Sequence, residues 1–175
     1  MDIYGTVFET IDMRSFSNLW YWIALAVMWS TASHWVLGVP FDMITRARRH
    51  GGQAETDLQD MVRINVNRLL FIARLSGLWI LAFVCFILSM LIGLGFVYDV
   101  EFAQAVFFLA FPMTIVGVLS LNSARLIEGE GFVMESIYKR LRWHRISTQG
   151  IGMVAIFITS MWGMFRNLSL GVLGG

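Results

Sequence analysis

The feature that most constrains this chain is the apolar run Leu75–Val97, in which no side chain is charged. A helix that crosses a membrane needs roughly 20 predominantly apolar residues, and this run has that length. Three other stretches are similarly apolar. The sequence therefore predicts four transmembrane helices, at about residues 19–39, 75–97, 102–121 and 146–166.

The composition agrees with a membrane protein. Hydrophobic residues make up 57% of the chain and charged residues only 14%, whereas about a quarter of the residues of a soluble domain are charged. We therefore expect an all-α membrane protein in which residues 1–175 form a single domain. The net charge of +1 gives no indication of nucleic-acid binding. Cys85 is the one cysteine, so no intramolecular disulfide can form.

Basic residues are concentrated in the two segments between the predicted helices, 40–74 and 122–145. Of the 13 Lys and Arg residues in the chain, all but Arg14 and Arg166 lie there. Because cytoplasmic loops of membrane proteins are enriched in Lys and Arg, these segments are expected to be cytoplasmic. This predicts a multi-pass protein of the bacterial inner membrane with both termini on the periplasmic side.

Three segments outside the four crossings have helical periodicity. Residues 1–16 place apolar side chains on one face and acids on the other, which predicts a short helix on the outer surface. Thr56–Arg74 follows the helix breaker Gly51-Gly52 and is expected to continue into the second crossing. Phe132–His144 carries an apolar stripe and is predicted to be an amphipathic interfacial helix.

The two basic segments resemble each other. Ala47-Arg48 matches Ala124-Arg125, and at the same offset Gly52 matches Gly129, Arg63 matches Arg140 and Arg68 matches Arg145. One interpretation is a duplicated two-helix hairpin, with the two copies in parallel orientation. The alternative is coincidence, because arginines are frequent in basic loops.

The most concentrated polar set lies just before the second crossing, where Arg63, Asn67 and Arg74 share one helical face. Arg74 is expected at the headgroup boundary, the alternative being a functional arginine within the membrane. Such residues favour anionic lipid headgroups, or an anion vestibule if several copies assemble. The candidate lipid- or anion-binding residues are Arg63, Asn67, Arg68, Arg74, Arg125, Arg140 and Arg145.

Cofactor and catalytic motifs are sparse. A membrane haem b needs two axial imidazoles at one depth, and His34 with His144 is the one candidate pair. We expect no cofactor, with haem bound through His34 as the alternative. No metal-ligand spacing is present, and the S-x-x-K match at Ser136–Lys139 lacks its companion motifs. The sequence therefore predicts a protein that is not an enzyme.

With the stretches IDMRSFSNLWYW, ASHWVLGVPFDM, RARRHGGQ and VRINVNRLLFIA, the chain resembles a family of small uncharacterised inner-membrane proteins of alphaproteobacteria. The resemblance covers most of the chain. Some members are labelled as components of a Suf iron–sulphur assembly complex, which implies a connection with cluster assembly. Cys85 alone cannot supply the several thiolates of a cluster scaffold.

These observations lead to three functional hypotheses. The first is a non-enzymatic four-span subunit that forms a homo-oligomer or joins a larger membrane complex, and whose basic loops engage anionic lipid or a cytoplasmic partner. The second is a homo-oligomeric anion channel or carrier with Arg74 at the cytoplasmic entrance. The third is a haem-binding electron-transfer subunit that uses His34.

Overall fold

The computed structural model describes residue 16 and residues 18–173. The outer helix predicted over residues 1–16 lies outside the described residues, apart from Phe16. The elements, in chain order, are α2 (Leu19–His34), β1 (Trp35–Val36), β2 (Val39–Pro40), α3 (Phe41–His50), α4 (Gln53–Ile92), the π-helical segment η2 (Gly93–Val97), α5 (Glu101–Gly129) and α6 (Met134–Leu173).

The predicted all-α class is confirmed, and the chain is a membrane-embedded helical protein. Among the described residues, three helices are long and apolar enough to cross a bilayer: Gln53–Val97, Glu101–Gly129 and Met134–Leu168. The second predicted crossing ends at Val97, as the helix does. The third and fourth predicted crossings lie within α5 and α6, which extend well beyond them at the basic end.

The first helix is shorter than the sequence predicted. α2 ends at His34 instead of Val39, and its 16 residues span about 24 Å, less than a hydrocarbon layer of about 30 Å. The cause is a tight turn at Leu37 and Gly38, where φ is positive and β1 pairs with β2. A crossing by the segment 19–39 therefore stays a prediction.

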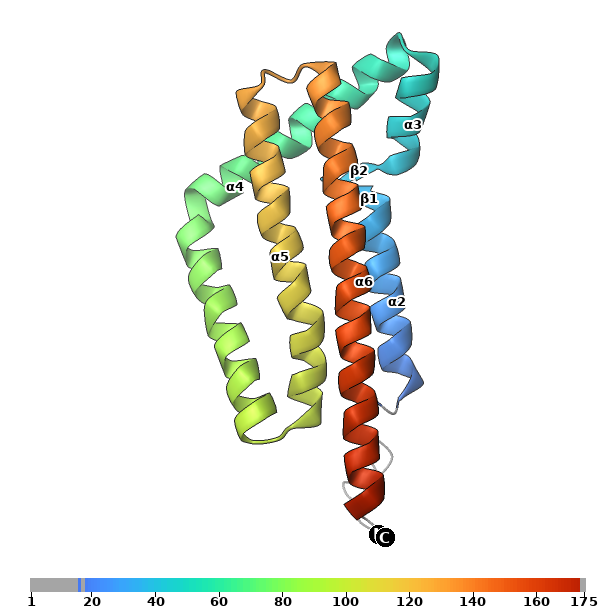
Figure 1. Ribbon diagram of the computed structural model, residues 1–175. Coiled ribbons are helices and arrows are strands. Elements are labelled where there is room, and N and C mark those ends of the chain that lie inside the picture. The colour runs from blue at the N-terminus through green and yellow to red at the C-terminus, as the bar shows by residue number, and fades with distance from the viewer. Residues whose placement is uncertain (1–15, 17, 174–175) are drawn as a thin grey trace, which may run out of the picture.

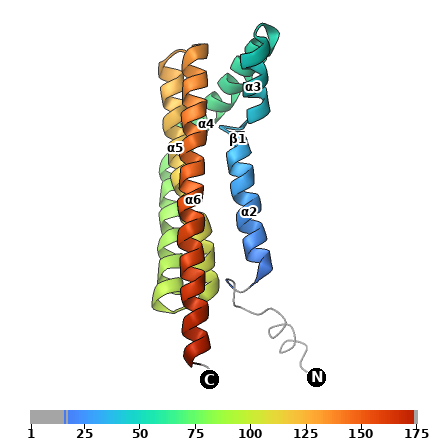
Figure 2. The ribbon, with the colours of Figure 1, turned by 45° about the vertical axis from the view of Figure 1, so that its right-hand side comes forward.

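Figure 1 shows how the helices are arranged. α5 and α6 run side by side, with α2 along α6 and the second half of α4 next to α5. The first half of α4 crosses the bundle at one end and reaches α3, which lies beyond the end of α2. The view in Figure 2 shows the same order, with α2 separate from the α4–α5 pair.

The end that contains α3 carries the basic segments, and we call it the basic end. Its segments 40–74 and 122–145 are mostly helical. Leu58, Val62, Val66 and Leu70 follow one another at i+4 spacing along α4 and are fully buried, in the ridge pattern of helix packing. They form a core with residues of the other helices, among them Ile44, Ala47, Ala124, Ile127, Ile137 and Leu141.

Both segments predicted to be helical outside the crossings at the basic end are part of longer helices. Thr56–Arg74 is part of α4, which starts after Gly51 and Gly52, both at positive φ, and continues unbroken into the membrane half. The predicted helix Phe132–His144 differs from the prediction, because residues from Met134 onwards are the start of the long helix α6 and not a separate interfacial helix. Its stripe residues Ile137 and Leu141 are buried in the protein core instead of facing lipid.

In the middle of the bundle, α2 packs on α6 through a tryptophan and a glycine. The Trp29 indole covers Gly152, where an added Cβ would lie 2.7 Å from Trp29 Cε3. Leu25, Val116 and Ala155 complete this small core. The missing side chain at position 152 is therefore what allows α2 to approach α6 so closely.

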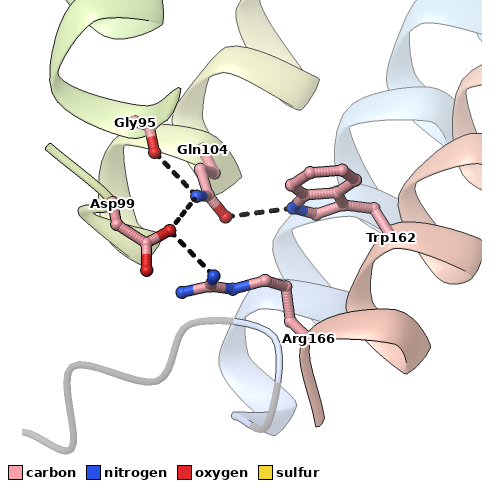
Figure 3. Close-up of polar contacts among 5 residues, drawn as sticks. All are labelled: Gly95, Asp99, Gln104, Trp162 and Arg166. Carbon is pink, nitrogen blue, oxygen red and sulfur yellow. Dashed lines mark hydrogen bonds and ion pairs between the residues drawn. The ribbon is translucent and has the colours of Figure 1, made fainter. Parts of the chain in front are cut away.

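The opposite end is held together by polar contacts, shown in Figure 3. Gln104 is 1% exposed, and its Nε2 donates to the carbonyl oxygen of Gly95 at 2.7 Å and to Asp99 Oδ1 at 3.2 Å. Trp162 Nε1 donates to Gln104 Oε1, and Arg166 Nη1 donates to Asp99 Oδ1. These contacts join the turn between η2 and α5 to the second half of α6.

The proposed duplication stays a prediction. Each half of the chain ends in a helix of 40 residues, α4 and α6. The preceding segments differ, because the β turn separates α2 from α3 whereas α5 is one continuous helix.

Candidate anion-binding groove

The surface of α6 changes from charged to apolar within one turn. Lys139 and Arg142 are exposed, and so are the aromatic and aliphatic side chains of Trp143 and Ile146 that follow them. Farther along, the exposed side chains include Met153 and Phe157. A change from cations through tryptophan to apolar residues is typical of the headgroup region of a bilayer.

Two adjoining hollows lie at this level, where α3 packs against α6. The first, the Lys139 hollow, has a volume of about 480 Å³ and the second, the Arg145 hollow, about 310 Å³. Together they form the basic groove. The Lys139 hollow is lined by Arg48, Glu135, Tyr138, Lys139, Arg142, Trp143 and Ile146. The Arg145 hollow is lined by Phe41, Ile44, Thr45, Arg48, Tyr138, Arg142, Arg145, Ile146 and Gln149.

Local helix geometry explains why these side chains meet. Tyr138, Arg142, Arg145 and Gln149 are three or four residues apart, so they lie on one face of α6. α3 is amphipathic and anchored by the buried Ile44 and Ala47, which leaves its basic residues outward.

The contact between α3 and α6 uses the apolar face of a guanidinium group. Arg145 Cζ lies 3.5 Å from the centroid of the Phe41 ring, a cation–π contact. The Nε atom of Arg145 is buried and has no hydrogen-bond partner among the described residues. Arg145 therefore helps to hold α3 in place and still lacks a partner for part of its donor capacity.

Cations outnumber carboxylates in the lining of the basic groove. Arg48, Lys139, Arg142 and Arg145 form no ion pair there, and Glu135 is the one acid among the described lining residues. Burying or crowding like charges is unfavourable unless an opposite charge joins them. The groove thus has the electrostatic character of an anion site.

Most of the predicted site residues lie elsewhere, and three are ion-paired. Arg63 binds Asp60 at 2.9 Å within α4, Arg74 binds Glu128 at 2.6 Å, and Arg140 binds Glu130. The hydrogen bond from Arg140 holds the pKa of Glu130 below its ordinary value. These arginines have structural partners, so their charges are partly satisfied within the protein.

The other four predicted residues are Asn67, Arg68, Arg125 and Arg145, and they do not lie together. Asn67 and Arg125 are exposed, and Arg68 lines a separate hollow of about 350 Å³ with Asn65, Ser120 and His144. Of the predicted set, Arg145 alone belongs to the basic groove among the described lining residues. An anion channel or carrier with Arg74 at its entrance stays a prediction.

The two histidines of the haem hypothesis have different surroundings. His34 is exposed, with its ring edge-on to Trp35. His144 is 3% exposed; its Nε2 lies 2.9 Å from Ser120 Oγ and its Nδ1 lies 3.5 Å from Thr148 Oγ1. Haem binding through His34 stays a prediction. No group of three or more His, Cys, Asp or Glu able to hold a metal ion occurs in the part of the chain that the structure describes.

Arg48, Lys139 and Arg142 were not predicted to be members of one site. The three-residue spacing of Arg142 and Arg145 indicates that they share one helical face, and this could have predicted the part of the groove that α6 contributes. The position of Arg48 depends on how α3 folds back onto α6, which is a long-range relationship that local periodicity does not contain.

Comparisons with known proteins give no relative of this chain. No family model, no curated protein and no solved structure matches it. The resemblance to the alphaproteobacterial inner-membrane family therefore stays a prediction.

Proposed function

We propose that this protein is a non-enzymatic, four-span subunit of the bacterial inner membrane that binds anionic lipid headgroups of the cytoplasmic leaflet through its basic end. The observation that carries the proposal is the basic groove, in which four cationic side chains form no ion pair with described residues, at the level where the surface of α6 becomes apolar. A basic pocket next to a crossing helix is a typical headgroup site.

The packing of α2 supports a fourth crossing. Trp29 of α2 contacts Gly152 of α6, and the exposed Met153 and Phe157 of α6 lie at the same depth. α2 also exposes large apolar side chains, including Leu19, Ile23 and Val27. The turn and strand residues up to Val39 would then complete the passage through the inner headgroup region.

The distribution of charge supports the orientation. The basic end holds every described Lys and Arg except Arg166, which is paired with Asp99 at the opposite end. By the positive-inside rule the basic end faces the cytoplasm, and both termini are periplasmic.

The membrane half of α4 exposes a continuous apolar surface that either lipid or another helix can cover. Its neighbouring residues Leu78 and Trp79 are 83% and 81% exposed, and most of its apolar side chains are not buried in the protein. Lipid can solvate such a surface, so native mass spectrometry in mild detergent is the direct measurement of the assembly state.

A thermal-shift assay of the full chain in detergent tests the lipid proposal. We expect phosphatidylglycerol to raise the melting temperature (Tm) more than phosphatidylethanolamine does. The double variant Arg48→Gln/Arg142→Gln should lose this difference. The matched control Arg46→Gln/Arg49→Gln removes two exposed charges from α3 outside the groove lining and should retain it. Equal shifts with both lipids in the unaltered protein would refute the proposal.

A further inference from the structure

The two hollows of the basic groove share one wall. Arg48, Tyr138, Arg142 and Ile146 line both of them. Each hollow also has a cation of its own: Lys139 lines the first and Arg145 the second. The groove therefore consists of two adjacent cationic seats with two arginines between them.

The charge of the groove exceeds what a single phosphodiester can neutralise. Four cations and Glu135 line it, whereas one phosphodiester group carries one negative charge. Because the lining carries a net charge of +3, a bound monoanion still leaves an excess of two positive charges in the groove. Two linked phosphates, one in each seat, match the arrangement better.

We propose that the basic groove binds a lipid whose headgroup carries two phosphates joined by a short linker, as in cardiolipin. This inference rests on the proposed binding of anionic lipid and specifies its class. One phosphate contacts Lys139 and the other contacts Arg145, while Arg48 and Arg142 between the seats interact with both. Arginine suits this bridging position because its guanidinium group donates in two directions at once.

The apolar edge of the groove favours a lipid over a free diphosphate. Ile146 lines both hollows and is 49% exposed, and Trp143 lines the Lys139 hollow and is 61% exposed. Acyl chains that leave the two phosphates would run along this edge towards the exposed apolar surface of α6. A soluble diphosphate has the charge but makes none of these apolar contacts.

The test is a titration of the purified full chain in detergent, followed by thermal shift and native mass spectrometry. Cardiolipin is compared with phosphatidylglycerol at equal phosphate concentration. Because both phosphates are on one molecule, we expect cardiolipin to bind about tenfold more tightly. Lys139→Gln and Arg145→Gln each remove one seat and should reduce cardiolipin binding to the level of phosphatidylglycerol. Arg49→Gln, which removes an exposed charge on α3, is the control.

The outcomes are distinguishable. If no anionic lipid binds better than phosphatidylethanolamine, the proposed function and this inference both fail. If the unaltered protein binds cardiolipin and phosphatidylglycerol equally at equal phosphate concentration, the two-phosphate inference fails alone. Inorganic pyrophosphate is the soluble probe, and displacement of cardiolipin by equimolar pyrophosphate would overturn the lipid assignment. The lipid-free Tm of each variant shows whether it folds, and Lys139, which is exposed, gives the variant least affected by packing.

Discussion

The guanidinium group of Arg74 lies 2.6 Å from a carboxylate oxygen of Glu128, so the bond joins the middle of α4 to the last turn of α5. The two residues are 54 positions apart. Arg74 precedes the long apolar run of α4, and this partner gives it a role in positioning the helix without requiring it to face a pore.

Exchanging the charges of this pair tests that role. Because the side chain of Arg74 is 68% exposed, we expect Arg74→Glu to reduce the free energy of unfolding only modestly, by up to about 1 kcal/mol. Adding Glu128→Arg should recover most of the loss. Thermal unfolding in detergent measures both, and Arg125→Glu, an exposed arginine of α5 without an ion pair among the described residues, is the control. Additive losses in the double variant would show that the pair contributes nothing.

A side chain at position 152 should separate α2 from α6. The Cβ of Gly152→Ala would lie 2.7 Å from Trp29, so we expect a loss of about 1–3 kcal/mol from overpacking. Gly150→Ala is the matched control, because a Cβ there meets nothing within 4 Å. Thermal unfolding again gives the comparison. Combining Gly152→Ala with Trp29→Leu, which replaces the indole by a smaller side chain, should recover part of the lost stability. Equal stability of Gly152→Ala and Gly150→Ala would contradict the close approach of α2 to α6.

The ion pair between Arg140 and Glu130 should depend on pH at the acidic side. Arg140 lowers the pKa of Glu130, so the folded state prefers the ionised carboxylate. The resulting stabilisation is present above the pKa of Glu130 in the unfolded chain. It is lost as the pH falls through the lowered pKa of the folded protein.

We expect Glu130→Gln to lower the Tm slightly at neutral pH and to leave it unchanged at a pH below the lowered pKa. Comparing the two Tm profiles from neutral to strongly acidic pH isolates this carboxylate from all other titrating groups. A constant difference between the profiles at every pH would exclude the ion pair as its source.

Accessibility of single cysteines tests the four-span topology. In a Cys85→Ala background, we expect an impermeant maleimide added to intact spheroplasts to label Leu19→Cys and Tyr98→Cys, both at exposed positions of the opposite end. Arg49→Cys at the basic end should react only after lysis. If Leu19→Cys and Arg49→Cys reacted under the same condition, either both in intact spheroplasts or both only after lysis, they would lie on the same side of the membrane. In that case α2 would not cross it, and the number of crossings would be three.

Local patterns in the sequence were enough for the helices but not for the groove. The long apolar run and Gly51-Gly52 predicted a helix that starts after the glycines and continues to Val97, as α4 and the following η2 do. The early end of α2 was missed, because it depends on Leu37 adopting a positive φ, which is uncommon for a leucine. The partners of Arg74 and Arg145 were also missed, since both contacts join residues distant in the chain, and no local periodicity encodes them.

α6 carries cations at two depths, Arg145 in the basic groove and Arg166 in the contact with Asp99. Along one straight helix they are separated by about 31 Å, close to the thickness of a bilayer's hydrocarbon layer. Because the rise per residue of an α-helix is fixed, the distance between these two cations along α6 is fixed as well. In a thicker or thinner bilayer the protein must tilt or deform the lipid around it, which gives it a preference for membranes of one width.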